Sequence, residues 1–242
     1  LFPYTTLFRS WIGSEGTLGV VTKAVLRLVP KPEGRWTCVA AFENERKALS
    51  AVKSLLGEGL VPSILEYLDV NSVHCAEDIA GVRLFKEVGG KPLLLIEFDG
   101  NPSDLRLAKR TVRAWADRLA LAFKEARGDK AADNLWEVRR KCSGAMFALG
   151  NAKINEDIVV PLESQLKFSD QLKRLQKRWN LPMPTFGHAA DGNFHVNIMF
   201  HREDPDELER AEGAVGDLMK MVVDLGGMIS GEHGIGLAKS PF

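Results

Sequence analysis

Strand and helix patterns alternate along the chain after Pro30 and Pro32, and this alternation constrains the fold more than any other feature. Runs of apolar and β-branched residues are typical of strands, whereas apolar residues three or four positions apart are typical of helices. Asp69 has the residue type and position of a helix N-cap. In the first half we expect strands at residues 36–42, 64–68 and 92–98, and helices at 43–56, from 70 onward, and from 103 to about 126.

The second half of the chain continues the same alternation. Its patterns predict helices at 134–147, 163–178 and 204–225, and strands at 153–160, 185–188 and 193–200. Asp191-Gly192 between two apolar runs is typical of a hairpin turn, and Gly226 stands where glycine commonly ends a helix. This order of elements predicts an α+β fold, in which helices pack on one face of a ferredoxin-like antiparallel sheet.

The composition is that of an ordinary globular protein, with 242 residues of which 45% are hydrophobic and 26% are charged. Lys plus Arg equals Asp plus Glu at 32 each, so no basic surplus points to a nucleic-acid partner. The three cysteines are odd in number and widely spaced, which favours a reducing compartment over a disulfide framework. There is no signal-peptide pattern and no apolar run of about 18–20 residues, so we expect a cytoplasmic protein.

Both ends of the sequence have the character of a fragment. Residues 1–10 have no clear period, and we interpret them as an artefact or a disordered segment to be left out of fold reasoning. Residues 13–19 form a glycine-rich turn that leads into a strand pattern at 20–29. The chain then stops at residue 242, where a new segment begins.

Histidines are concentrated around the predicted hairpin. Residues 195 and 197 share one face of a strand because strands have a period of two, and His188 can face the same side from the opposing strand. Two imidazoles, from His188 and His195, would then converge with the carboxamide of Asn197. Zinc, manganese or iron suits imidazole ligands, but such a site needs a further ligand, usually a carboxylate.

The segment Ser230-Gly231-Glu232-His233-Gly234-Ile235-Gly236 offers that carboxylate. On a regular element, adjacent Glu232 and His233 point in different directions, so one can bind a metal while the other faces a substrate. The flanking glycines allow the close backbone approach that an active-site turn needs. The pattern is not HExxH, so it does not support a metalloprotease of that type.

Simpler interpretations compete with a metal site. We interpret His74 and His201 as structural residues held by hydrogen bonds. Asp191-Gly192-Asn193 consists of residue types that favour a turn whether or not a metal binds, and Gly234 to Gly236 would serve as a plain loop. From spacing alone, the metal site and the structural interpretation of His188, His195 and Glu232 stay equally open.

Three motifs in order resolve this ambiguity. They are GSEGTLGVVT at 13–22, GHAADGNFHVN at 187–197 and SGEHGIGLAK at 230–239. Together they resemble the FAD-linked oxidase family of D-lactate, glycolate and D-2-hydroxyglutarate dehydrogenases, flavoproteins of the vanillyl-alcohol-oxidase type. The resemblance extends from residue 11 to 242. It implies that 11–32 is the C-terminal end of an FAD-binding domain, and that 33–242 is a substrate and metal domain truncated at its C-terminus.

The resemblance also implies roles for individual residues. His188, His195 and Glu232 match ligands of a divalent metal, and His233 matches the catalytic general base. The residues that match substrate-binding positions are Asn197, Lys153 and Arg139, with Arg140 as an open alternative to Arg139. The residues that match the FAD-lining segment are Gly13, Ser14, Gly16, Thr17, Gly19 and Val20. Ala190 departs from the family, which usually has glycine at this place in the turn.

The implied function is FAD-dependent oxidation of a small D-2-hydroxy acid to the 2-oxo acid, with a metal ion that chelates the substrate. The run NEDIVVP at 155–161 is more similar to the D-lactate and glycolate branches. The resemblance implies an electron acceptor as partner (a quinone, a cytochrome or an electron-transfer protein), and association with an iron–sulfur subunit or the inner membrane surface.

Two alternatives stay open at this point. A metal-dependent hydrolase could use the same two histidines and glutamate without flavin, but it leaves the glycine-rich residues 13–19 unexplained. The second alternative is an inactive fragment that needs a flavin domain from elsewhere, because residues 11–30 are too few to build such a domain. On that account the chain by itself binds little or no FAD.

Overall fold

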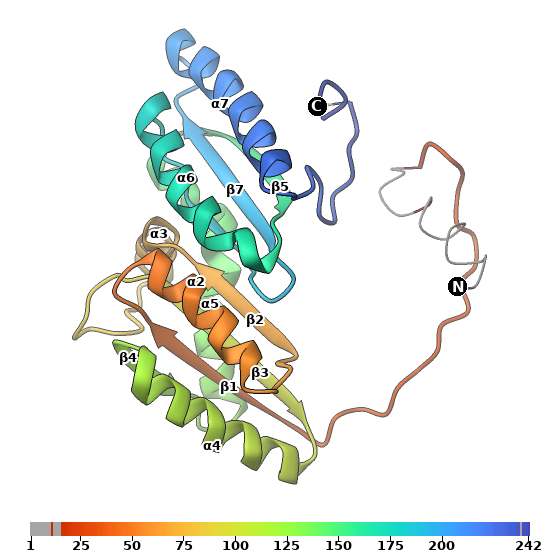
Figure 1. The fold of residues 1–242 in the computed structure, drawn as a ribbon, viewed down its shortest axis with the longest axis vertical. Helices are drawn as coiled ribbons and strands as arrows, with labels where there is room; N and C mark the ends of the chain where they lie inside the picture. The colour runs from red at the N-terminus through yellow and green to blue at the C-terminus, as the bar shows by residue number, and fades with distance from the viewer. Residues whose placement is uncertain (1–10, 12–15, 238) are drawn as a thin grey trace.

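A seven-stranded antiparallel sheet organises the chain in the computed structural model, which describes residue 11, residues 16–237 and residues 239–242. The strand order is β4-β1-β3-β2-β6-β7-β5 (Figure 1). The strands are β1 (Gly34–Ala41), β2 (Ile64–Leu68), β3 (Leu93–Gly100), β4 (Ala122–Glu125), β5 (Ala152–Val159), β6 (Thr185–His188) and β7 (Asn193–Phe200). The helices are α2 (Glu45–Gly57), α3 (Val70–Ala80), α4 (Pro102–Leu119), α5 (Asp129–Ala145), α6 (Gln165–Trp179) and α7 (Pro205–Asp224), with short 3₁₀ turns η1 (Met146–Leu149) and η2 (Leu162–Ser164).

The sheet consists of two similar halves. In the first half, strands β1 to β4 have the order 4-1-3-2, which is the ferredoxin-like arrangement. The second half repeats it with β5, α6, β6, β7 and α7, and a single bridge between Val159 and Met228 takes the place of the fourth strand. Pairing of β2 with β6 joins the halves, with Glu66 opposite His188. The predicted α+β class with a ferredoxin-like antiparallel sheet is therefore confirmed.

Helices cover both faces of this sheet, whereas the sequence predicts a layer on one face. Helices α2, α4, α6 and α7 lie on the near side in Figure 1 and pack on the larger core. Helices α3 and α5 pack on a second core at the other face. The reason is that the central strands are apolar on both sides: Ile96 belongs to the first core and its neighbour Leu95 to the second. A strand buried on both faces needs cover on both faces.

Local sequence signals predict most boundaries of the helices and strands. Asp69 caps α3 by accepting a hydrogen bond from the backbone N–H of Ser72, as predicted. Asp204 caps α7 in the same way. The helix predicted from 103 to about 126 is too long: α4 ends at Leu119, and β4 follows as an edge strand paired with β1. The described helices include none with the length and apolar character needed to cross a bilayer.

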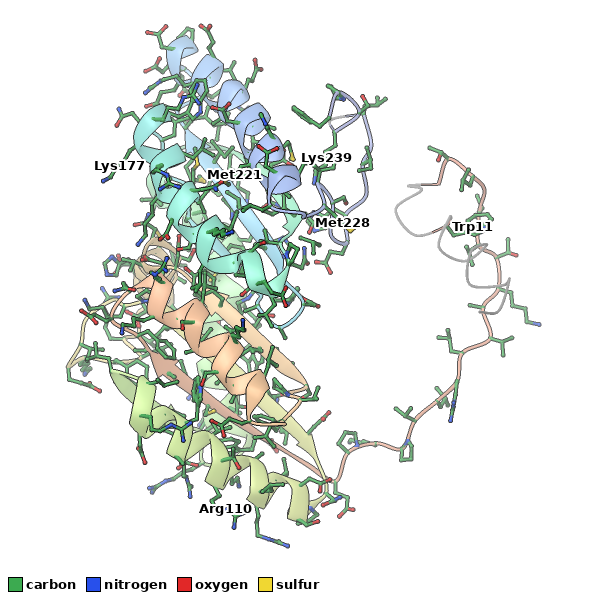
Figure 2. All side chains as sticks on the ribbon, in the orientation of Figure 1. Trp11, Arg110, Lys177, Met221, Met228 and Lys239 are labelled. Carbon is green, nitrogen blue, oxygen red and sulfur yellow. The ribbon has the colours of Figure 1, made fainter. Side chains whose placement is uncertain are left out.

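The strand predicted at residues 20–29 is not formed in this structure. The described residues from 18 to 33 have neither helix nor strand, and apolar side chains such as Val20 and Val25 are exposed. The physical reason is that a strand needs a partner for its backbone hydrogen bonds, and no described residue pairs with this segment. Figure 2 shows Trp11 beside this segment, apart from the sheet.

Candidate metal and substrate site

Two histidines meet because the β6–β7 hairpin has the predicted turn. His188 ends β6 and His195 lies in β7, where Phe186 is paired with His195 and His188 with Asn193. Gly192 closes the turn with a φ of 80°, and a side chain there would collide with the carbonyl oxygen of Val160. The ring centroids of His188 and His195 are 5.9 Å apart. The hairpin therefore presents both imidazoles on one face.

Glu232 and His233 reach the same place from the loop after α7. The Oε1 atom of Glu232 lies 3.7 Å from Nε2 of His195 and 3.9 Å from Nε2 of His233. The rings of His195 and His233 are stacked with centroids 5.4 Å apart. Because these neighbours lie on a loop and not on a regular element, both can approach His195.

One candidate ligand atom from each of His188, His195 and Glu232 lies within 4.8 Å of the others. Two imidazoles and a carboxylate at this spacing form a donor set suited to zinc, manganese or iron. Burial lowers the pKa of His195, which favours the neutral ring that a metal ligand must be. The residues present thus fit a divalent ion.

Asp157 fixes the loop that carries Glu232 and His233. Its Oδ2 accepts hydrogen bonds of 2.8 Å from the backbone N–H groups of Gly231, Glu232 and His233. Its Oδ1 accepts a 2.6 Å bond from the amide of Asn193. Burial alone would raise the pKa of Asp157, but these hydrogen bonds lower it to about 2. The carboxylate is therefore ionised and acts as an internal anion in a nest of N–H groups.

Lys239 ties the end of the described chain to the same strand. Its buried ammonium donates to the carbonyl oxygens of Asp157 and Ile229 at 2.7 and 2.6 Å, and lies 3.3 Å from Glu156. Figure 2 places Lys239 and Met228 beside the C-terminal end of α7. This lysine and Asp157 together hold both ends of the SGEHGIGLAK segment against β5.

Glu66 links the metal-ligand candidates to an arginine. It is 3% exposed, and its two oxygens bind different partners: Oε1 binds Nδ1 of His188, and Oε2 accepts a 2.6 Å hydrogen bond from Nε of Arg139. Burial alone would raise the pKa of Glu66, but the bond from His188 and the charge of Arg139 outweigh it, so the pKa is lowered. The bond to Glu66 raises the pKa of His188.

A cavity of about 530 Å³ opens beside this ion pair. Arg139 and His188 both line it, together with Trp136, Arg140 and Asp191. The guanidinium of Arg139 also lies 4.6 Å above the ring of Phe186. A cavity with an oriented guanidinium next to a candidate metal site has the chemistry to hold a small carboxylic acid.

The other predicted substrate residues lie nearby without joining the ligand cluster. Lys153 donates to the carbonyl and hydroxyl oxygens of Ser143 at 3.0 and 2.9 Å, one helical turn after Arg139 on α5. Arg140 is bound to Glu137 at the surface. Asn197 is buried in β7, and its Oδ1 atom has no hydrogen-bond partner within the described residues. His74 and His201 lie outside the cluster.

The predicted flavin-lining residues are only partly covered by the structure. Gly13 and Ser14 lie outside the described residues. Gly16 and Gly19 have positive φ angles of 80° and 153°, and a side chain at Gly19 would collide with the ring of Trp11. Thr17 and Val20 are exposed. The glycines fit a turn that lets the backbone approach a cofactor, and their role toward FAD stays a prediction.

Sequence reasoning missed Glu66, Asp157 and Lys239 as parts of the site. A signal was present for Glu66, because it is a carboxylate inside an otherwise apolar strand pattern. A charge that must be buried in a strand requires a partner. The partners could not be identified from the sequence, because Glu66 and His188 are 122 positions apart.

The fold and the site together define a domain with a candidate metal centre next to a cavity that Arg139 and Arg140 line. The profile of the C-terminal domain of FAD-linked oxidases matches residues 31–242, and the chain belongs to this family. The chain is 34% identical to the glycolate oxidase subunit GlcD of Bacillus subtilis over 98% of its own length and 50% of the relative's. It is 29% identical to a probable mitochondrial D-lactate dehydrogenase of Danio rerio, over 98% and 47% of the respective lengths. It thus spans about half the length of the curated relatives it matches.

Solved structures support the fold alone. A 4-ethylphenol oxidase from Gulosibacter chungangensis superimposes with a TM-score of 0.63 at 15% identity, covering 86% of this chain and 47% of the oxidase. A p-cresol methylhydroxylase gives a TM-score of 0.64 at 13% identity, covering 83% and 46%. Both are similar in architecture to the sheet described above.

Proposed function

We propose that this chain is the substrate- and metal-binding half of an FAD-dependent enzyme that oxidises a small D-2-hydroxy acid, D-lactate or glycolate, to the 2-oxo acid. The observation that carries the proposal is the convergence of His188, His195 and Glu232 beside the cavity that Arg139 lines. The names of the relatives agree with it, since they include a glycolate oxidase subunit and a D-lactate dehydrogenase. FAD would be held largely by sequence outside these 242 residues, and residues 13–20 would be this chain's contribution to its binding.

The substrate carboxylate would be bound by Arg139, with Lys153 as a second cation. A guanidinium can grip a carboxylate through two parallel hydrogen bonds, which fixes the orientation of the Cα–H bond. Arg139 is preferred to Arg140 because Glu66 and Phe186 hold it inside the cavity, whereas Arg140 is occupied by Glu137. Asn197 is our candidate for a contact with the substrate hydroxyl, since its buried oxygen is unpartnered.

The proton of the α-hydroxyl would pass to Nε2 of His233. This imidazole stacks on His195 and is half-exposed, so it can take up a proton beside the ligand cluster and release it to water. When bound, a divalent ion held by His188, His195 and Glu232 would supply positive charge to the substrate oxygens, and FAD would supply the two-electron oxidant for the Cα–H bond. An electron acceptor would be needed to reoxidise the flavin.

The proposal is tested in an intact protein that carries this sequence together with its flavin. D-Lactate or glycolate should bleach the flavin absorbance, and His233→Ala should slow bleaching by a factor of about 100 or more while metal content is unchanged. Surface His201 provides the control, because His201→Ala removes an imidazole that is bound to Glu207 away from the cluster. No bleaching with any of a panel of 2-hydroxy acids would contradict the proposal, and loss of metal in His233→Ala would reassign that residue.

A further inference from the structure

Glu66 occupies the junction of three elements at the site. It lies in β2 of the first half of the sheet, directly opposite His188 in β6 of the second half, and Arg139 reaches it from α5. Side chains directly opposite on antiparallel strands face the same side and contact each other. One buried carboxylate therefore contacts a candidate metal ligand and a candidate substrate-binding residue at once.

The bond between Glu66 and His188 determines which ring nitrogen is free. An ionised carboxylate accepts hydrogen bonds and cannot donate them, so Nδ1 of His188 must carry the proton. In the neutral ring this leaves the lone pair on Nε2 for a metal ion. Histidine ligands of metals commonly donate their other ring N–H to a carboxylate, which also raises their basicity.

The bond between Glu66 and Arg139 orients the guanidinium. The Nε atom donates to Oε2, while the face of the group lies over the ring of Phe186, and that ring packs 5.5 Å from His195. Among the residues that the structure describes, no hydrogen-bond partner occupies the two terminal nitrogens of Arg139. These nitrogens are the ones that a bidentate carboxylate would bind.

We propose that Glu66 is a positioning residue, which holds His188 in the tautomer that can bind a metal ion and holds Arg139 with its terminal nitrogens free for an anion. The inference rests on the proposed metal site and adds to it a residue from the other half of the sheet. It also explains why a charged residue is buried in β2 at a place where its neighbours Leu65 and Tyr67 are core residues.

Glu66→Gln separates the two contacts. A glutamine has one acceptor oxygen, which can still receive the Nε–H group of Arg139, and its amide donors then face Nδ1 of His188. The ring would move its proton to Nε2 to accept that bond, and Nε2 could no longer bind a metal ion. Glu66→Asp keeps the negative charge on a shorter side chain, so it should retain part of the metal affinity that Glu66→Gln loses.

The experiment uses cobalt(II) as probe on the purified 242-residue chain, followed by its visible absorption. Glu66→Gln should raise the Kd for cobalt by about 10- to 100-fold. Nitrogen-15 NMR of the metal-free protein should show the Nδ1–H form of His188 in the wild type and the Nε2–H form in Glu66→Gln. A matched control is Glu125→Gln, because Glu125 also binds an arginine and a ring N–H (Arg113 and Trp36) but lies in β4 at the far edge of the sheet.

The outcomes separate the two proposals. Wild-type affinity in Glu66→Gln with the Nδ1–H form retained would overturn the role of Glu66 and leave the metal site standing. If the wild-type chain gives no cobalt spectrum, or if His195→Ala leaves the spectrum unchanged, the metal site is overturned and the inference with it. Thermal unfolding of each variant monitors the fold, and an equal loss of affinity in Glu125→Gln would show that the effect is one of stability, which also overturns the inference.

Discussion

Asp157 accepts three successive backbone N–H groups from the loop that contains Glu232 and His233, so a single carboxylate fixes the position of a candidate ligand and of the candidate base. Gly231 allows this approach, because a side chain there would collide with Asn193 and Asp157. The described residues of this loop, 230–236, form neither helix nor strand. Its geometry therefore depends on a residue 74 positions earlier in the chain.

We predict that Asp157→Asn loosens this loop. The amide loses the negative charge, and when its one acceptor oxygen stays with the three backbone N–H groups its NH2 group faces the side-chain amide of Asn193, so the free energy of unfolding should fall by about 2 kcal/mol. Hydrogen–deuterium exchange at Gly231, Glu232 and His233 should become faster. Asp217→Asn serves as control, since Asp217 lies in α7 and accepts a hydrogen bond from the ring N–H of Trp179 in α6. Unchanged exchange at the three amides in Asp157→Asn would refute the role given to this carboxylate.

The candidate ligands could be predicted from the sequence because the motifs that carry them are local. His188 and His195 are fixed relative to each other by a short hairpin, and its Asp-Gly turn is visible in the sequence. Glu66 could not be predicted as their partner. Its contact with His188 arises from the pairing of β2 with β6, which depends on how the two halves of the sheet meet.

Helix and strand boundaries follow local chemistry at most positions. The strands at 64–68, 185–188 and 193–200 have the predicted bounds. The exceptions are β4, a four-residue edge strand whose pattern is hidden at the end of an amphipathic helix, and residues 20–29, which have a strand pattern but no partner among the described residues. The second layer formed by α3 and α5 also could not be predicted, because the pattern of a helix does not say which face of a sheet it covers.

Helix α7 leads into the site loop, and its N-cap offers a test at this scale. Asp204 accepts hydrogen bonds from the backbone N–H groups of Asp206 and Glu207 at 3.0 and 3.2 Å. Asp204→Ala should lower the free energy of unfolding by about 1 kcal/mol. Asp224 at the opposite end of the same helix is the control, because a negative charge there opposes the helix dipole and Asp224→Ala should change stability by about 0.5 kcal/mol or less. Denaturant unfolding measures both, and equal losses would argue against capping.

The whole molecule brings the site together from distant parts of the chain. The ligand candidates all belong to the second half of the sheet, while Glu66 comes from the first half, and α5 supplies Arg139 between them. The apolar side chains exposed at 20–29 lie apart from this arrangement. We propose that this segment is the C-terminal end of the FAD-binding domain, as the family resemblance implies.

The central claim is that His188, His195 and Glu232 bind one divalent ion. X-ray absorption spectroscopy at the zinc edge measures this directly on the 242-residue chain loaded with one equivalent of zinc. We expect a shell of nitrogen and oxygen at about 2.0–2.2 Å, with the outer-shell scattering of two imidazoles, and one imidazole fewer in His195→Ala. A spectrum without imidazole scattering, or one that His195→Ala leaves unchanged, would contradict the account.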